Sequence, residues 1–300
     1  MPIDPSLSLA GLVVGLLVGL TGMGGGALLT PLLVLVFGVQ PLAAISSDLV
    51  TSLVMKPVGA AVHLRRKTVQ TGLVWWLALG AVPAGFLGSL LIGSIGHSAD
   101  VQHYLKIAIG VALVGSFGCT IARLVLDRRA GTPGATGPLV VKPVRTVAIG
   151  VVGGVAVGMT SVGAGSLIIA MLLLAYPRLR PAQLVGTDIV QAIPLVAAAA
   201  LGHLLFGEVH FGVTASLLVG ALPGVYVGAR LSAQASASFT RPVVAGVLLG
   251  SALALLSAPT PVLVLGAAAA AAGTCWLGRG PVVPDHPPVD LVKREPVLAR

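Results

Sequence analysis

The sequence predicts an all-α polytopic membrane protein: two homologous, inverted repeats that form about seven transmembrane helices and two re-entrant helical hairpins. Composition is the first observation, because hydrophobic residues make up 56% of the 300 residues and charged residues only 9%. A soluble globular chain carries about 25% charged residues. The second observation is an internal repeat, and the third is the distribution of Lys and Arg along the chain.

The internal repeat covers most of the chain. The stretch GLVVGLLVGLTGMGGG (11–26) returns as GVVGGVAVGMTSVGAG (150–165), and after a one-residue insertion PLAAISSDLV (41–50) returns as PAQLVGTDIV (181–190). One register accounts for all the matches, which indicates a duplicated unit. The matching pairs include Asp48 with Asp188, His63 with His203, Gly11 with Gly150, Gly15 with Gly154, Gly19 with Gly158, Gly24 with Gly163 and Gly26 with Gly165.

The repeat and the polar segments around it predict the organisation of the chain. The apolar runs are long enough to cross a bilayer, which takes about 20 residues. The clear spans lie at 44–64, 71–95, 101–126, 182–205, 210–233 and 240–257. The full division is a first transmembrane repeat (8–126), a cytoplasmic linker (127–146), a second transmembrane repeat (147–257), an additional transmembrane helix (261–278) and a cytoplasmic tail (279–300).

The first apolar element of each repeat, 8–37 and its mate 147–176, has two interpretations. A continuous helix over 8–37 would be about 45 Å long, whereas the hydrocarbon core of a bilayer is about 30 Å thick. The glycine-rich stretch TGMGGG (21–26) interrupts this run near its middle. The element either crosses the membrane as a broken helix or enters and turns back as a re-entrant hairpin.

The positive-inside rule favours the re-entrant hairpin. If the element crosses the membrane, the basic residues divide evenly between the two sides. If it is re-entrant, each repeat has three crossings, the repeats are inverted and the N-terminus lies outside. All Lys and Arg residues except Lys56 and Lys106, which stay unplaced, then lie in the cytoplasm. The acidic loop FGEVH (206–210) lies outside, opposite its basic counterpart LRRKTV (64–69).

Charge and motifs exclude several classes of protein. In a membrane protein, the net charge of +9 reports orientation and anionic lipid headgroups rather than nucleic-acid binding. The chain has no HExxH, GxSxG, GxxxxGK[ST] or Cys/His cluster, and Cys119 and Cys275 both lie in apolar runs. We therefore expect no enzyme, no metal site and no cofactor. Since the N-terminus lacks a basic region and a cleavage site, we expect no cleaved signal peptide.

The repeated elements resemble a known family. The run GLVVGLLVGLTGMGGGALLTPLLVLVFGV with its Pro31, residues 44–48, the downstream His63 and the duplication itself are similar to the TauE/SafE sulfite exporter family of bacterial membrane permeases. The resemblance covers nearly the whole chain. It implies transport of small anions, notably sulfite and organosulfonates, across the cytoplasmic membrane. Many members have a Thr-Ser pair where this chain has SSD (46–48) and GTD (186–188), so a carboxylate is added at each matching site.

The glycine-rich segments are the first candidate site. Glycines let a ligand approach the backbone closely, and half-helices that begin at about Gly26 and Gly165 would present partial positive charge to an anion. Alternatively, the glycines only allow a tight turn, and those in the GxxxGxxxG ladders before them favour close helix packing. The candidate substrate-binding residues are Thr21, Gly22, Gly24, Gly25, Gly26, Thr160, Ser161, Gly163, Gly165 and Lys56.

Ionisable residues in the predicted spans are the second candidate site. We expect Asp48, Asp188, His63 and His203 to couple transport to an ion, because intramembrane acids bind protons or cations and histidine relays protons. Each acid also suits a structural role, since it follows Ser or Thr at a predicted helix start, where a carboxylate caps free N–H groups. Each histidine also suits a structural hydrogen bond. Lys56, in mid-span, would pair with Asp48 two turns away or attract an anion.

Together these features predict a secondary transporter (permease) that moves a small anion, such as sulfite or an organosulfonate. The alternative is a proton-coupled transporter of a cation or neutral solute that uses Asp48 and Asp188. The expected partners are the small anionic substrate and the lipid bilayer, with no nucleic acid; a homo-oligomer is left open. The expected location is the inner (cytoplasmic) membrane, which the chain crosses several times.

Overall fold

The computed structural model describes residues 3–21, 25–65, 67–95, 98–129, 141–177, 179, 181–206, 209–231 and 237–278. Within these residues the chain folds into eleven α-helices and contains no extended strand. The helices are α1 Pro5–Thr21, α2 Gly26–Leu35, α3 Pro41–Arg65, α4 Thr71–Ile95, α5 Ala99–Arg129, α6 Pro143–Thr160, α7 Leu167–Ala175, α8 Pro181–Phe206, α9 Phe211–Leu231, α10 Ala237–Leu255 and α11 Thr260–Gly278.

The predicted break in the first element of each repeat is confirmed. Helix α1 ends at Thr21 and α2 begins at Gly26, while α6 ends at Thr160 and α7 begins at Leu167. Each glycine in a helix interior is less favourable than alanine by about 1 kcal/mol. Helix α1 therefore ends where the glycine-rich stretch begins, and the shorter α2 begins at its last glycine.

Seven helices in the described part of the chain are long and apolar enough to cross a membrane. Six of them coincide with predicted spans, and the seventh, Pro143–Thr160, belongs to the predicted hairpin element 147–176. The predicted span 240–257 corresponds instead to the shorter apolar helix Pro242–Leu255. The multi-pass, all-helical class is confirmed. The seven helices selected by length and composition differ in one member from the seven spans predicted from the positive charges: α6 is included and α10 is not.

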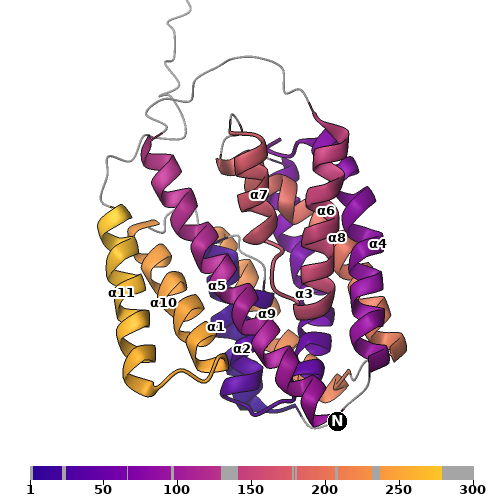
Figure 1. Cartoon of the computed structure of the whole chain (residues 1–300), viewed down its shortest axis with the longest axis vertical. Coiled ribbons are helices and arrows are strands. Elements are labelled where there is room, and N and C mark those ends of the chain that lie inside the picture. Colours follow the sequence, from indigo (N-terminus) through magenta and orange to yellow (C-terminus); the bar gives the residue numbers. More distant parts are fainter. Residues whose placement is uncertain are drawn as a thin grey trace, which may run out of the picture.

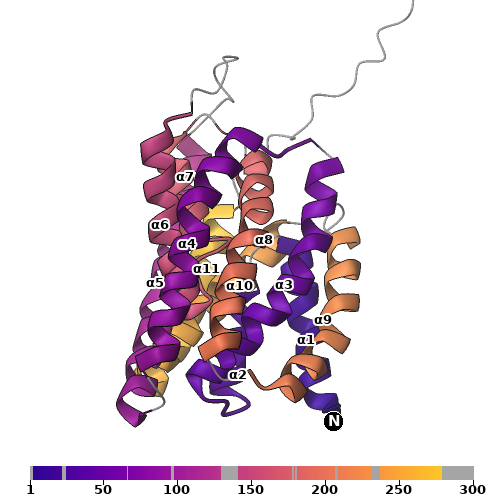
Figure 2. The same cartoon turned by 90° about the vertical axis from the view of Figure 1, so that its right-hand side faces the viewer.

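The two repeats interlock. Helix α1 packs against α9, and α6, the counterpart of α1, packs against α4, the counterpart of α9. The same exchange pairs α3 with α9 and α8 with α4. Figure 2 shows α1 beside α9 on one side of the molecule and α4 beside α6 on the other, with α3 and α8 between them. In Figure 1, α10 and α11 lie at the opposite edge from α4.

The predicted close packing of the glycine ladders is confirmed. A Cβ atom at Gly15 of α1 would lie 2.4 Å from the carbonyl oxygen of Ala221 in α9, and one at Gly154 of α6 would lie 2.5 Å from the carbonyl oxygen of Ala81 in α4. Because Ala221 and Ala81 also match in the repeat register, the two interfaces use corresponding residues. Backbone contact of the same kind occurs at Gly11, Gly19, Gly150 and Gly158.

Candidate functional site

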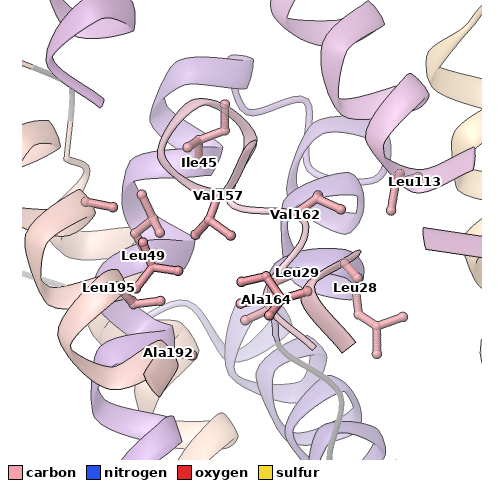
Figure 3. Packing of buried hydrophobic residues seen from close by; sticks show 14 of the residues in the cluster. Leu28, Leu29, Ile45, Leu49, Leu113, Val157, Val162, Ala164, Ala192 and Leu195 are labelled. Carbon is pink, nitrogen blue, oxygen red and sulfur yellow. The ribbon is translucent and has the colours of Figure 1, made fainter. Parts of the chain in front are cut away.

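The end of the first glycine-rich stretch, at Gly26, meets the second glycine-rich turn in the interior of the protein. Gly26 begins α2, and a Cβ atom there would lie 1.9 Å from the carbonyl oxygen of Ser161, which directly follows α6. Only glycine permits so close an approach. Figure 3 shows Val162 and Ala164 of the second turn near Leu29 of α2, all of them buried. Segments from the two repeats therefore form one buried centre.

The second turn has an unusual backbone that directs its side chains. Ser161 adopts a left-handed conformation (φ 57°, ψ −6°), and its N–H donates to the carbonyl oxygen of Val157 at 2.8 Å. Gly163 and Gly165 have φ of 131° and 97°, values that favour glycine. A serine in this region is uncommon. The neighbouring Thr160 hydroxyl donates to two backbone carbonyl oxygens, that of Ala156 in its own helix and that of Val162 in the turn.

Asp48 is the residue on which the second turn and α2 converge. Its carboxylate is 0% exposed. Oδ2 accepts hydrogen bonds from the Ser161 hydroxyl at 2.6 Å and the Thr30 hydroxyl at 2.9 Å, and Oδ1 accepts one from Ser52 at 3.2 Å. These three donors come from the second turn, from α2 and from α3 itself. Such bonds to a buried carboxylate stabilise its position strongly.

Asp188, the matching acid of the second repeat, is 1% exposed but has fewer partners. The side-chain amide of Gln191 donates to Oδ1 at 3.0 Å, and the backbone amide of Gly165 also interacts with this carboxylate. Among the described residues, Asp188 Oδ2 and Gln191 Oε1 have no hydrogen-bond partner. Buried polar atoms without a partner are rare in folded proteins, and they mark a place where a proton, water or ligand binds.

Lys56 connects the two acids electrostatically. It is half-buried in the middle of α3 and is followed by Pro57. Its ammonium group lies within electrostatic range of both carboxylates. The predicted pairing with Asp48 is therefore part of a larger arrangement, in which a cation from the first repeat faces the acid of the second.

The predicted capping role of the two acids needs a correction. Helix α3 begins at Pro41 and α8 at Pro181, so Asp48 and Asp188 each lie about two turns inside their helices and do not cap them. Each lies instead near the start of the short helix of its own repeat. A Cβ atom at Gly25, the N-cap of α2, would lie 3.6 Å from Asp48 Oδ1, and Gly165 precedes α7. A carboxylate there is favoured by the helix dipole.

The two matching histidines have different surroundings. His203 is fully buried, with Nδ1 2.9 Å from the Ser46 hydroxyl and Nε2 2.9 Å from the carbonyl oxygen of Gly158. It thus links α8 to α3 and to the end of α6, directly before the second turn. His63 is half-buried at the end of α3, with Nδ1 3.1 Å from the Thr68 hydroxyl. His203 belongs to the support of the centre, and His63 lies at a helix end.

The structure brings together many of the predicted site residues and adds others. Gly25, Gly26, Ser161 and both acids share the centre, with Lys56 in electrostatic contact. Gly22, Gly24 and the side chain of Thr21 lie outside the described residues. The residues that sequence reasoning missed are Thr30, Ser46, Ser52 and Gln191.

An interlocked pair of helical repeats around buried polar groups is the arrangement of a membrane transporter. Residues 7–255 match the family model described as Sulfite exporter TauE/SafE. The chain therefore belongs to the TauE/SafE sulfite exporter family, and it is a multi-pass protein of the cell membrane. The family resemblance seen in the sequence is confirmed.

Several similar proteins are described as probable membrane transporters. The chain is 42% identical over 256 residues to the probable membrane transporter protein YjnA of Bacillus subtilis (strain 168), which covers 84% of this chain and 99% of that protein. It is 27% identical over 244 residues to the probable membrane transporter protein YdhB of the same organism, covering 79% and 96% of the two chains. A probable membrane transporter protein of Xylella fastidiosa (strain Temecula1 / ATCC 700964) is 30% identical over 233 residues. No solved structure matches the chain.

Proposed function

We propose that this protein is a secondary transporter that moves a small anion, of the sulfite or organosulfonate class, across the cytoplasmic membrane. The observation that carries the proposal is the meeting of the two glycine-rich turns at a buried polar centre with the Lys56 ammonium group nearby. Sulfur oxyanions are compact and carry several acceptor oxygens. Backbone amides, hydroxyls and one ammonium group are suitable donors to such oxygens.

In this proposal the backbone supplies most of the donors. The N-cap of α2 makes no side-chain capping bond, and neither does the N-cap of α7. First-turn N–H groups have no partner within their own helix and present partial positive charge. Lys56 supplies the full positive charge. The proposed binding set also retains the predicted Thr21, Gly22, Gly24, Thr160, Ser161, Gly163 and Gly165.

We further propose that the repeats are inverted and that α1–α2 and α6–α7 are re-entrant hairpins. The crosswise contacts of α1 with α9 and of α6 with α4 support a two-fold relation between the repeats. In Figure 1, α1 and α2 lie in the lower part of the molecule and α6 and α7 in the upper part, as expected if the hairpins enter from opposite sides. Irregular backbone at membrane depth is tolerated where protein surrounds it.

The two buried carboxylates, Asp48 and Asp188, would repel an anion placed against them. They therefore favour the alternative function, transport of a cation or a neutral solute. The two functions can be distinguished by whether an anion or a cation stabilises the purified protein on binding. We expect sulfite or methanesulfonate, added as the sodium salt, to raise the melting temperature of the purified protein, whereas sodium chloride at equal ionic strength does not.

Lys56→Ala should lose this stabilisation, whereas Lys106→Ala, which changes an exposed lysine of α5, should keep it. Stabilisation by cations alone, equal in wild type and Lys56→Ala, would contradict anion transport.

A further inference from the structure

The two matching aspartates are chemically unequal. Asp48 accepts three hydroxyl hydrogen bonds, two of them on Oδ2. Asp188 accepts one side-chain hydrogen bond on Oδ1, while its Oδ2 is buried and has no partner among the described residues. An ionised carboxylate is satisfied by several donors, whereas a carboxylic acid brings a donor of its own. The surroundings of Asp48 therefore suit a permanent carboxylate, and those of Asp188 suit a group that gains a proton.

This inequality is present in the sequence. In the repeat register, Ser52 corresponds to Ala192 and Ser161 corresponds to Gly22. Thr30 corresponds to Ile169 or Ala170, depending on where the inserted residue lies. None of the three positions that correspond to the hydroxyl donors of Asp48 therefore carries a hydroxyl that could serve Asp188. Lys56, which corresponds to Val196, is also unique to the first repeat.

The charged groups around Asp188 are few. Helix α8 packs against α3, α4, α6 and α7. Helix α3 contributes Asp48, Lys56, His63 and, exposed at its end, Arg65; of these, Lys56 is the cation that acts on Asp188. Helices α4 and α7 have no titratable residue, and α6 has Arg145, exposed in its first turn. On α8 itself, both ring nitrogens of His203 already have hydrogen-bond partners, the Ser46 hydroxyl and the Gly158 carbonyl oxygen.

A proton fits the vacant oxygen better than a metal ion does. The described residues contain no group of three or more His, Cys, Asp or Glu side chains that could hold a metal. Asp188 and Gln191 together offer two buried acceptor oxygens without a partner among the described residues, Asp188 Oδ2 and Gln191 Oε1, and the Lys56 ammonium group opposes a second cation. A proton needs only one oxygen and removes the negative charge by forming a covalent O–H bond.

We propose that Asp188, and not its counterpart Asp48, is the site that binds and releases the coupling proton, and that its protonation admits the anion. This inference rests on the proposed anion transport. A proton from water adds to Asp188 Oδ2 and converts the carboxylate into a carboxylic acid. The charge of Asp48, Asp188 and Lys56 together then changes from one net negative charge to zero, which leaves Lys56 available to an anion. When the proton returns to water, Lys56 is again balanced by Asp188 and the anion leaves. Proton and anion therefore move in the same direction.

Infrared difference spectroscopy of the purified full-length protein, titrated in pH without substrate, tests this site independently of transport. A protonated buried carboxyl group has a C=O stretching band that an ionised one lacks. We expect one such band to titrate in wild type, to persist in Asp48→Asn and in Ser161→Ala, and to be lost in Asp188→Asn. Because Asp188→Asn could misfold, Gln191→Leu provides a second test, and it should move the midpoint of the band's titration.

The contradicting outcomes are distinct. A band that persists in Asp188→Asn, or that is lost only in Asp48→Asn, would overturn the assignment to Asp188. Stabilisation of wild type but not Asp188→Asn by Na⁺ at constant pH would assign the site to a metal cation instead of a proton. If the band behaves as expected but sulfite and sulfonates neither bind nor move, the proton site stands and the proposed substrate is wrong.

Discussion

The Ser161 hydroxyl donates a 2.6 Å hydrogen bond to Asp48 Oδ2, and this bond joins the turn of one repeat to the long helix of the other. Both residues are buried, with 6% and 0% of their surfaces exposed. Gly26 allows the Ser161 backbone to lie directly against α2, beside this bond. The position of the second turn therefore depends on a contact between residues far apart in the sequence.

Removing this hydroxyl should destabilise the protein. Ser161→Ala leaves a buried carboxylate with one donor fewer, and a hydrogen bond to a charged group contributes about 1.5–3 kcal/mol. We expect the free energy of unfolding, measured by denaturant titration in detergent, to fall by about that amount. The matched control is Ser94→Ala, whose exposed hydroxyl donates to the Leu91 carbonyl oxygen of its own helix. Equal effects of the two substitutions would show that the Ser161 bond is unimportant.

The contact between the two turns should not tolerate a methyl group at Gly26. In Gly26→Ala the new Cβ atom would meet the Ser161 carbonyl oxygen and carbon, so the turns must separate. We expect loss of substrate binding and a lower melting temperature. Gly118→Ala is the control, because a Cβ atom at Gly118 in α5 would have no neighbour within 4 Å. A Gly26→Ala protein with wild-type binding would refute the turn-to-turn contact.

Enlarging a glycine in the ladder of α6, which packs against α4, should lower the stability of the protein. In Gly154→Ala the added Cβ would lie 2.5 Å from the Ala81 carbonyl oxygen and 2.9 Å from its Cα, both of them backbone atoms that cannot move aside locally. Overpacking of this kind costs about 1–3 kcal/mol. A thermal melt should place Gly154→Ala well below Gly273→Ala, whose site in α11 is open. Similar melting temperatures for the two variants would contradict the packing.

Membrane sidedness can be measured with cysteines. The two natural cysteines, Cys119 and Cys275, are free thiols and should first be replaced by serine. Inverted repeats predict that a cysteine at the exposed Pro177, after α7, lies inside, while one at the exposed His210, before α9, lies outside. An impermeant maleimide added to intact cells should label only the second. Labelling of the first from outside would show that the repeats are not inverted.

The sequence was sufficient for much of the fold. Apolar runs predicted the long helices, clustered glycines predicted where α1 and α6 end, and the glycine ladders predicted close packing because small residues let helix backbones approach. The starts of α3 and α8 were less well predicted. Helix α3 begins at Pro41, three residues before its predicted span, and α8 begins at Pro181, one residue before, so Asp48 and Asp188 lie about two turns inside their helices.

The partners of the two acids were only partly accessible from the sequence. Ser52 and Gln191 follow Asp48 and Asp188 by four and three residues, the spacing that places side chains side by side on a helix. Thr30 and Ser161 lie on other segments, and a repeat register shows which residues correspond without showing which residues touch. The difference in hydrogen bonding between Asp48 and Asp188 can therefore be recognised only in the structure, where their donors are known.

The most direct test of anion transport is the movement of radiolabelled sulfite into proteoliposomes, with and without a pH gradient. We expect wild-type protein to accumulate sulfite faster when the outside is acidic, since proton and anion enter together. Lys56→Ala should lose this uptake, while Lys106→Ala keeps it. If wild-type protein that is folded and correctly inserted moves no sulfite or sulfonate under either condition, or if Lys56→Ala transports as well as wild type, the proposed anion site is wrong.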